Sequence, residues 1–388
     1  MTAHETAAHV CIQTRSPLFL WGGPGIGKTA VLEQIADALE EPLHTVILSI
    51  REPSDQGGLP YIMRSDGTAL PEGAAGLLDA GVRMVPPMWA RMLSADGHGV
   101  VFWDEFNTAV PTTQSSALRV IHGGYAGDLR LPSETSHVAA GNPATQVAGG
   151  YDLTAAIANR WTHIDWPVDS NTWANGMVAG FPKPVVTRLP SSWRDSLAAK
   201  RGLVSAFIRR KPNLLYMLPK APSEQGRAWA SPRMWDRVAT LMAASNGIGH
   251  GEKSEVGRLL IHGCVGQAAG AEFIEWVANL DLRDPEDYLA DPSTPLPQRQ
   301  DQLMATLDSV AAAALDKTKA DKDQVTRYRA AWKLVGRAKK AGKGDVAVPS
   351  ARVLATNMPK EVKRDLPPEI EEMLPLLEAA GIDYSRTR

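Results

Sequence analysis

The chain has 388 residues, with 44% apolar and 22% charged residues and a formal net charge of −2 at pH 7. These values are ordinary for a globular protein, and they exclude both a wholly disordered chain and a molecule that binds polyanions through its overall charge. The length is sufficient for two or three domains. Cys11 and Cys264 are the only cysteines, which are too few for a disulfide framework or a cysteine-rich zinc site.

The first ten residues, MTAHETAAHV, lack the basic and then apolar layout of a signal peptide. No apolar run in the sequence is long enough to span a bilayer. We therefore expect a cytoplasmic protein with no membrane insertion.

Up to about residue 168, short β-branched and aromatic runs alternate with helical stretches. This pattern is typical of a parallel sheet covered by helices on both faces, so the predicted fold class is α/β with five strands. The strands are expected at 18–21, 45–50, 100–103, 137–140 and 162–166. Residues 51–99 form a Gly/Pro-rich insertion that is too long for a plain connection, and GGYAGDLRLPSET predicts a smaller hairpin.

From about residue 190 the strand signal fades, and apolar residues recur at helical spacing. We expect an α/β core over 1–185, a helical domain over 186–282 and a helical C-terminal extension over 283–388. The boundary near residue 283 follows from four prolines between 285 and 297, which interrupt the helical pattern.

The segment GGPGIGKT, residues 22–29, fits the phosphate-loop pattern and stands between a predicted strand and a predicted helix. Its glycines allow successive amides to surround a phosphate, Lys28 can neutralise β- and γ-oxygens, and the Thr29 hydroxyl can reach Mg²⁺. The alternative is a glycine-rich turn that matches by chance. The expected nucleotide contacts are Gly22, Pro24, Gly25, Ile26, Gly27, Lys28, Thr29, Ala30 and Asp104.

The third predicted strand ends in VVFWDEF, which places Asp104 and Glu105 at the carboxyl edge of the sheet, where ligands bind in open α/β folds. Asp104 and Thr29 are the expected Mg²⁺ ligands, and Glu105 is expected to orient or deprotonate the attacking water. The alternative is a pair of solvated turn residues. The acidic pair favours hydrolysis over binding alone.

Two further residues are candidates for the same reaction. Asn142, in AAGNP, follows the fourth strand and can hold the attacking water, although Asn-Pro is also a common way to open a turn. Arg160 ends a helix that we expect to begin at Asp152, and it can act as an arginine finger that stabilises charge on the transferring phosphoryl group. The alternative is a cation that merely favours the negative end of the helix dipole.

The heptapeptide WASPRMW carries another unusual arginine. Ser231 and Pro232 predict a helix start, yet Arg233 stands in the first turn, where a cation is disfavoured by the helix dipole. An anion in front of this helix explains the position. Solvation of an exposed arginine is the alternative.

The order of these motifs over residues 1–280 resembles that of the AAA+ ATPases, specifically the MoxR branch of the helix-2-insert and pre-sensor-1 clades. The resemblance implies strand order 5-1-4-3-2, a helical lid over 186–282, a ring that is usually hexameric, and ATP sites at subunit interfaces. It also implies a role for each candidate. Walker A holds Lys28 and Thr29, Walker B holds Asp104 and Glu105, sensor 1 is Asn142, the finger acting on a neighbour's ATP is Arg160, and sensor 2, reaching its own subunit's γ-phosphate, is Arg233.

The sequence departs from that family where DEFNTA stands in place of Asp-Glu-Ile-Asn-Arg, so the arginine is absent. The insertion after the second strand is longer than is typical, and the last hundred residues match no pattern that we can name. These departures bear on which subgroup of the family the chain resembles and on which residues would form the pore of a ring.

The leading hypothesis is a Mg²⁺-dependent, ring-forming ATPase that remodels or matures a protein partner, which the resemblance implies to be a von Willebrand factor A domain protein. One alternative is a nucleic-acid-stimulated motor or a restriction-associated NTPase, and another is a nucleotide-gated scaffold that turns over slowly. The basic tract TRYRAAWKLVGRAKKAGKG can favour the nucleic-acid alternative. However, Tyr328, Trp332 and Val335 recur at helical spacing, as expected of a helix that packs one face and solvates the other.

Overall fold

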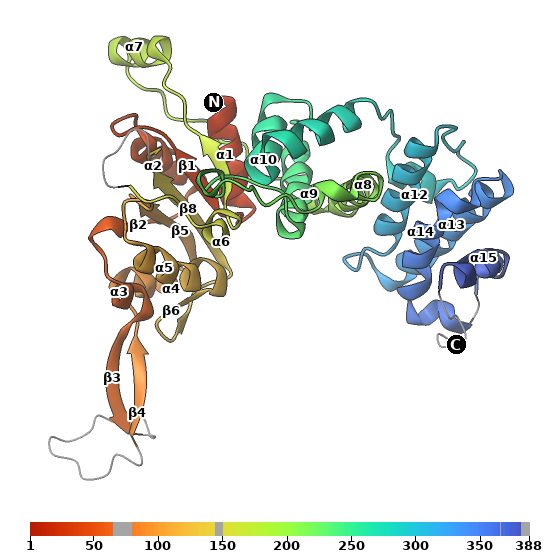
Figure 1. The fold of residues 1–388 in the computed structure, drawn as a ribbon, viewed down its shortest axis with the longest axis horizontal. Helices are drawn as coiled ribbons and strands as arrows, with labels where there is room; N and C mark the ends of the chain where they lie inside the picture. The colour runs from red at the N-terminus through yellow and green to blue at the C-terminus, as the bar shows by residue number, and fades with distance from the viewer. Residues whose placement is uncertain (65–79, 144–149, 365, 382–388) are drawn as a thin grey trace.

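The computed structural model describes residues 1–64, 80–143, 150–364 and 366–381 (Figure 1). Its central sheet has five parallel strands in the order β2-β5-β8-β1-β9. Numbered along the core this order is 5-1-4-3-2, so the expected α/β fold class and strand order are confirmed. The strands are β1 (Leu18–Trp21), β2 (Leu43–Ile47), β5 (His98–Asp104), β8 (Glu134–Gly141) and β9 (Thr162–Asp165).

Alternate residues of the strands enter two separate cores, because successive side chains of a strand point to opposite faces of a sheet. Leu18, Leu20 and Ile164 pack with α1 (Ala3–Gln13), α2 (Lys28–Leu39) and the lid helices. Phe19 and Trp103 belong to the opposite face, which is covered by three helices. These are α4 (Met88–Asp96), α5 (Pro111–Gly123) and α6 (Ala155–Ala158).

The insertion after β2 contains a two-stranded arm that projects from the core (Figure 1). It follows η1 (Leu48–Ile50) and α3 (Pro53–Gly57), and its strands are β3 (Leu59–Arg64) and β4 (Ala80–Val85). Residues 65–79 lie outside the described part of the chain. The smaller predicted hairpin is confirmed as β6 (Tyr125–Ala126) paired with β7 (Leu129–Arg130).

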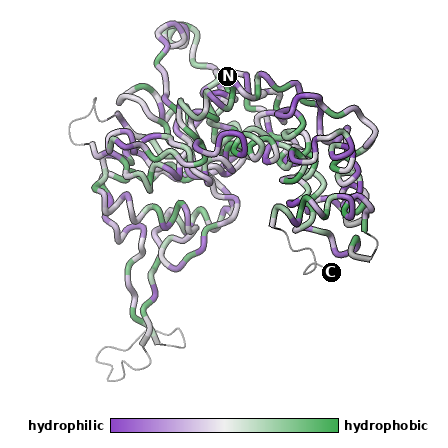
Figure 2. Tube along the Cα trace, turned by 45° about the vertical axis from the view of Figure 1, so that its right-hand side comes forward, coloured by the Kyte–Doolittle hydropathy of each residue, from purple (hydrophilic) through white to green (hydrophobic). Residues whose placement is uncertain are grey.

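The second region of the chain is helical. Helix α7 (Ser170–Ala179) precedes this region and projects away from it (Figure 1). The region itself contains η3 (Ser191–Ser196), α8 (Leu197–Arg210), η4 (Pro212–Leu214), η5 (Pro222–Glu224), α9 (Pro232–Gly247) and α10 (Glu255–Ala278). Apolar segments run from the strands into these helices through the centre of the molecule (Figure 2). The lid therefore shares a hydrophobic core with one face of the sheet.

The C-terminal extension has a core of its own. Its elements are α11 (Pro285–Ala290), α12 (Gln300–Ala314), α13 (Asp321–Lys340), α14 (Gly344–Thr356), η6 (Lys360–Arg364) and α15 (Pro368–Ala379). Helix α12 packs closely against α8, since a Cβ added at Gly202 would lie 2.4 Å from the Cα of Ser309. The extension is thus joined to the lid.

Helix α13 carries the basic tract, and it is packed as an amphipathic helix. Tyr328, Trp332 and Val335 are buried in the C-terminal core. The Arg327 guanidinium forms a bidentate ion pair with the carboxylate of Glu286. Further contacts within the extension join Arg337 to the carbonyls of Pro292 and Thr294, Lys340 to Glu372 and Lys343 to Gln298.

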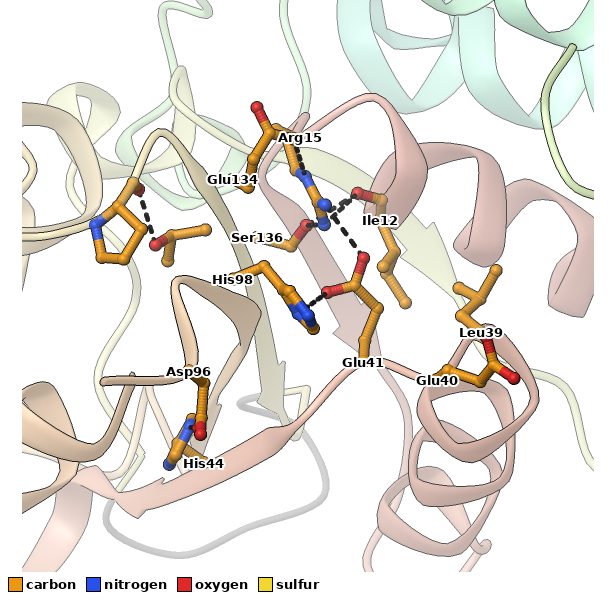
Figure 3. A network of polar contacts seen from close by, with 12 residues as sticks. Ile12, Arg15, Leu39, Glu40, Glu41, His44, Asp96, His98, Glu134 and Ser136 are labelled. Carbon is orange, nitrogen blue, oxygen red and sulfur yellow. Dashed lines mark hydrogen bonds and ion pairs between the residues drawn. The ribbon is translucent and has the colours of Figure 1, made fainter. Parts of the chain in front are cut away.

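A polar cluster joins four elements at the amino edge of the sheet (Figure 3). The Arg15 guanidinium lies 2.9 Å from Glu41 Oε1 and donates to Ser136 Oγ at 2.9 Å, while His98 Nδ1 lies 3.3 Å from Glu41 Oε2. Arg15 follows α1 and Glu41 follows α2. Ser136 lies near the start of β8, and His98 is the first residue of β5. The cluster thus joins these elements at the end of the sheet opposite the phosphate loop.

None of the helices that the structure describes is long and apolar enough to cross a membrane.

Candidate nucleotide-binding site

The predicted phosphate loop connects β1 to α2. Gly25 and Gly27 adopt φ values of 75° and 86°, a left-handed conformation that favours glycine. Gly27 is also the N-cap of α2 and supplies no side-chain acceptor to the first amides of the helix. Those amides therefore face a turn that is suited to an anion such as a phosphate.

Lys28 joins this loop to the neighbouring strand. Its Nζ donates to the carbonyl oxygens of Gly22 at 2.6 Å and Gly23 at 2.9 Å, and to Asn142 Oδ1 at 3.1 Å. Burial lowers the pKa of Lys28, and the nearby Asp104 carboxylate opposes that shift. The structure thus brings three of the predicted residues, Lys28, Asn142 and Asp104, to one edge of the sheet.

Asp104 and Thr29 supply oxygen donors that fit Mg²⁺. Asp104 is the last residue of β5, and its Oδ1 accepts the Glu105 amide at 2.9 Å. Thr29 is the second residue of α2, with a half-buried side chain. The described residues contain no cluster of three or more His, Cys, Asp or Glu that could hold a metal. Two protein donors suit Mg²⁺, which usually completes its shell with water and substrate phosphates.

Glu105 occupies a sharp turn directly after β5. Its φ of 52° is left-handed, which is uncommon for a residue with a side chain. The Ser49 hydroxyl, in η1 after β2, donates to Glu105 Oε2. Because β2 and β5 are neighbours, the strand order itself brings Ser49 to the carboxylate. The sequence analysis did not identify Ser49, since a lone serine after a strand gives no signal.

Asn107 is a second residue that the sequence analysis missed. It is only 2% exposed, its Nδ2 donates to the Asn142 carbonyl at 2.7 Å, and its Oδ1 accepts the Asn142 amide at 3.0 Å. This reciprocal pair fixes the backbone of Asn142. The available signal was an asparagine three positions after Asp104, in DEFN.

The helix expected over 152–160 is shorter than predicted. Helix α6 spans Ala155–Ala158, because the Thr154 hydroxyl accepts the Ile157 amide at 3.3 Å and caps the helix there. The prediction that Asp152 begins this helix is therefore wrong. Arg160 lies two residues beyond the end of α6, and its Nη1 donates a hydrogen bond to the Ala156 carbonyl.

The helix start at Ser231 is confirmed, since its hydroxyl accepts the Met234 amide at 3.3 Å and Pro232 is the first residue of α9. Arg233 Nη1 donates to the Asn159 carbonyl at 3.3 Å, and Arg237 Nη1 donates to the Arg160 carbonyl at 2.6 Å. Burial lowers the pKa of Arg160, and the positive charge of Arg233 lowers it further. Two predicted residues, Arg160 and Arg233, thus meet in one place.

We call Arg160, Arg233 and Arg237 the arginine cluster. Together they also lower the pKa of His122 at the end of α5, after the larger effect of burial. Among the residues that the structure describes, none of the three forms an ion pair with an acidic side chain. Arg233 makes no described hydrogen bond to residues 22–29, and its expected reach to its own subunit's γ-phosphate stays a prediction.

A cavity of about 390 Å³ lies between β9, α1 and the lid. Asp165 in its wall is paired in register with Trp21, the residue directly before Gly22. The other walls include His4 from α1, together with Arg227 and Arg258 from the lid region. The cavity is thus bordered by polar groups at the edge of the sheet that holds the loop.

No protein-family model and no curated protein matches the chain. Among solved structures, a candidate ATPase from Cytophaga hutchinsonii has a TM-score of 0.42 at 18% identity, over 70% of this chain and 86% of its own. An MCM homologue from Methanopyrus kandleri has a TM-score of 0.34 at 14% identity, over 71% of this chain and 53% of its own. NtrX from Brucella abortus, in complex with ADP, has a TM-score of 0.26 at 13% identity, over 90% of this chain and 67% of its own.

Proposed function

We propose that this chain is a Mg²⁺-dependent ATPase of the AAA+ type. The observation that carries the proposal is the contact of Lys28 Nζ with Asn142 Oδ1 at 3.1 Å, beside the Asp104 carboxylate. It unites a phosphate loop, a metal-binding acid and a water-holding amide at one edge of the sheet, where Glu105 also lies. Phosphoryl transfer needs these groups for positioning and for charge stabilisation.

Each residue has a defined task in this reaction. The amides of Gly25, Ile26 and Gly27 and the Lys28 ammonium bind the β- and γ-phosphates. Thr29 and Asp104 would hold Mg²⁺, which supplies charge neutralisation at the phosphate oxygens. Asn142 orients a water, and Glu105 accepts its proton as the oxygen attacks the γ-phosphorus and the bond to the β-phosphate oxygen breaks. The products are ADP and inorganic phosphate. We assign the base and ribose to the cavity bordered by Asp165, the residue paired in register with Trp21.

The arginine cluster supports a site shared between subunits. Cations that lack an acidic partner are costly to gather in one place, and an incoming phosphate offsets that repulsion. We therefore assign Arg160 and Arg233 together to the nucleotide of a neighbouring subunit. This differs from the role in its own subunit that the sequence predicts for Arg233. It requires an assembly in which subunits face one another, and we propose a hexameric ring, as the resemblance implies.

The cellular task that we propose is remodelling or maturation of a protein partner, with a von Willebrand factor A domain protein as the first candidate. Its support is the order of motifs along residues 1–280 alone. The nucleic-acid alternative is less favoured, because Arg327, Arg337 and Lys340 of the basic tract contact the extension itself.

The test is phosphate release with ATP and Mg²⁺ by the wild type, Glu105→Gln and Lys28→Ala. We expect Glu105→Gln to bind ATP and release no phosphate, and Lys28→Ala to bind weakly. Equal turnover by Glu105→Gln and wild type would overturn the assignment of Glu105. Stimulation of turnover by DNA or RNA, with strong salt dependence, would favour the alternative function.

A further inference from the structure

A buried hydrogen bond lies directly under the phosphate loop. Trp21 is the last residue of β1 and is bonded to Gly22, and its Nε1 donates to His163 Nδ1 on β9 at 2.8 Å. The two rings are nearly parallel, with an interplanar angle of 11°. The strand residue that enters the loop at Gly22 is therefore joined to β9 through its indole.

The other ring nitrogen of His163 contacts the end of α6, since Nε2 lies 2.9 Å from the Ala158 carbonyl. An indole nitrogen can only donate, so Nδ1 accepts and the proton is on Nε2, which donates to Ala158. Burial lowers the pKa of His163 to about 4, which keeps the ring neutral. Ala158 is two residues from Arg160, so His163 joins the base of the phosphate loop to the turn that carries the expected finger.

The next residue, Asn159, connects the same turn to the lid. Its side chain is 6% exposed, its Oδ1 accepts the Ser231 hydroxyl at 2.6 Å, and its Nδ2 donates to the Trp229 carbonyl at 2.9 Å. Its own carbonyl accepts from Arg233 at 3.3 Å. Both polar groups of the Asn159 side chain are thus used to fix the start of α9 against the turn.

Arg227 gives a second contact between the lid region and Trp21. Its guanidinium carbon lies 4.2 Å from the centroid of the Trp21 ring, and Nη1 lies 2.8 Å from Asp165 Oδ1. A cation over an indole face is attracted by the ring, and the Asp165 carboxylate holds the guanidinium in place. Trp21 is therefore in contact with both β9 and the segment that leads into α9.

We infer that Trp21, His163 and Asn159 are positioning residues that connect nucleotide on the phosphate loop to the arginine cluster. Nucleotide binding shifts the loop, the shift passes from Trp21 through His163 to the turn at 158–160, and Asn159 passes it to Arg233. The inference rests on the proposed function, because it requires a nucleotide on the loop. It adds a consequence: nucleotide bound to one subunit's phosphate loop changes how Arg160 and Arg233 of that subunit are positioned toward the nucleotide of the next subunit.

Hydrogen exchange of the peptide over 154–162, with and without ADP, tests the connection in the full chain. We expect ADP to change exchange there in the wild type. Trp21→Phe removes the donor and keeps an aromatic ring, and His163→Asn keeps an acceptor near Nδ1 but loses the donor to Ala158. Both variants should bind ADP with a Kd within about threefold of wild type and lose most of the change over 154–162.

Trp103→Phe is the matched control. Its indole donates to His137 Nδ1 at 3.3 Å in the same sheet, so the substitution removes a bond of the same kind. That bond does not reach α6, and the control should keep the response to ADP. His163→Gln, which can retain the donor to Ala158, is the second variant if Trp21→Phe fails to fold.

The outcomes separate the two proposals. A full response in Trp21→Phe and His163→Asn would overturn the connection, as would ADP binding by the wild type with no change over 154–162. Equal loss in Trp103→Phe would also overturn it, because the effect would then be general to the sheet. Failure of the wild type to bind ADP would instead refute the proposed function.

Discussion

Lys28 Nζ donates to Asn142 Oδ1 at 3.1 Å, across the boundary between the phosphate loop and β8. The two residues are 114 positions apart in the chain, and they meet because β1 and β8 are paired in parallel, with Trp21 opposite Gly141. Each strand ends in a residue that leads directly into the site. The Asn142 amide is thereby placed beside Lys28 at the carboxyl edge of the sheet.

Asn142→Ala should lower kcat by roughly 100-fold with a smaller change in KM, because a hydrogen-bonding group that acts in the transition state is lost. Steady-state phosphate release measures both constants. Asn107→Ala provides the comparison, since it loosens the Asn142 backbone without removing the amide. A KM increase with unchanged kcat in Asn142→Ala would mean that the residue only binds nucleotide.

Ser49→Ala should raise the basal rate of ATP hydrolysis a few-fold, about 2- to 5-fold. The Ser49 hydroxyl donates to Glu105 Oε2, which occupies an acceptor position of that oxygen and holds the carboxylate beside η1. Without the hydroxyl, Glu105 is freer to accept the proton of the attacking water. Phosphate release is the measurement, and Ser49→Thr, which keeps a hydroxyl, should behave as wild type. A rate below wild type in Ser49→Ala would show that Ser49 places Glu105 productively.

The fold was predictable from the sequence because its signals are local. The five strands are short runs that contain β-branched, aromatic or other apolar residues, and GGPGIGKT is a loop whose strand and helix neighbours are visible in sequence. Strand ends were less predictable, since β5 and β8 extend past their apolar centres to Asp104 and Glu134. The Thr154 cap that shortens α6 was also missed, because Asp152 is an equally good capping residue on paper.

The partners of the site residues were not predictable, since they depend on side-chain contacts between distant elements. Ser49 is brought to Glu105 only by the pairing of β2 with β5. Asn159 looked like an ordinary polar residue beside Arg160, yet its two side-chain bonds go to Trp229 and Ser231. Sequence spacing identified Arg160 and Arg233 separately, and only the structure places them together.

Mixing experiments should decide whose nucleotide Arg233 serves. Arg233→Ala subunits keep an intact phosphate loop, and Lys28→Ala subunits keep intact arginines. If Arg233 acts on the neighbouring subunit, mixing the two variants restores turnover at sites that combine the intact parts. The same recovery is expected for Arg160→Ala with Lys28→Ala. If only the mixture with Arg160→Ala recovers turnover, Arg233 acts on the nucleotide of its own subunit. If neither mixture recovers turnover, the result counts against a shared site.

Stability should fall as the pH is lowered from about 6.5 toward 4. Burial lowers the pKa of His9, His137 and His163 from 6.5 to about 4. Between these values the unfolded chain takes up protons that the folded chain does not, so the unfolded state is favoured. Each histidine should cost about 1 kcal/mol between pH 7.5 and 5.5.

Urea unfolding at pH 7.5 and 5.5 measures this loss. His137→Gln removes one of the three buried imidazoles, so its unfolding free energy should fall less between the two pH values than that of the wild type. An equal fall in both proteins would mean that His137 titrates normally in the folded state.

The contact between the lid and the C-terminal extension depends on a buried carboxylate. Asp308 is 5% exposed, and its oxygens accept from Arg209 Nε at 2.9 Å on α8 and from Ser350 Oγ at 2.6 Å on α14. Ser205 Oγ also donates to Asp308, at 3.4 Å. Asp308→Ala leaves these three donors without their acceptor, which should cost roughly 2 kcal/mol or more, somewhat less than for a fully buried pair because Arg209 is partly exposed.

Limited proteolysis should then cut the Asp308→Ala protein faster near residues 280–300, between α10 and α12, and calorimetry should show the C-terminal unit melting first. Asp301→Ala is the control, since Asp301 is on the same helix and its ion pair is with the nearby exposed Arg299. If both variants melt as one unit with the wild-type midpoint, the Asp308 contacts are not what holds the extension to the lid. Close packing at Gly202 and Ser309 would then be sufficient by itself.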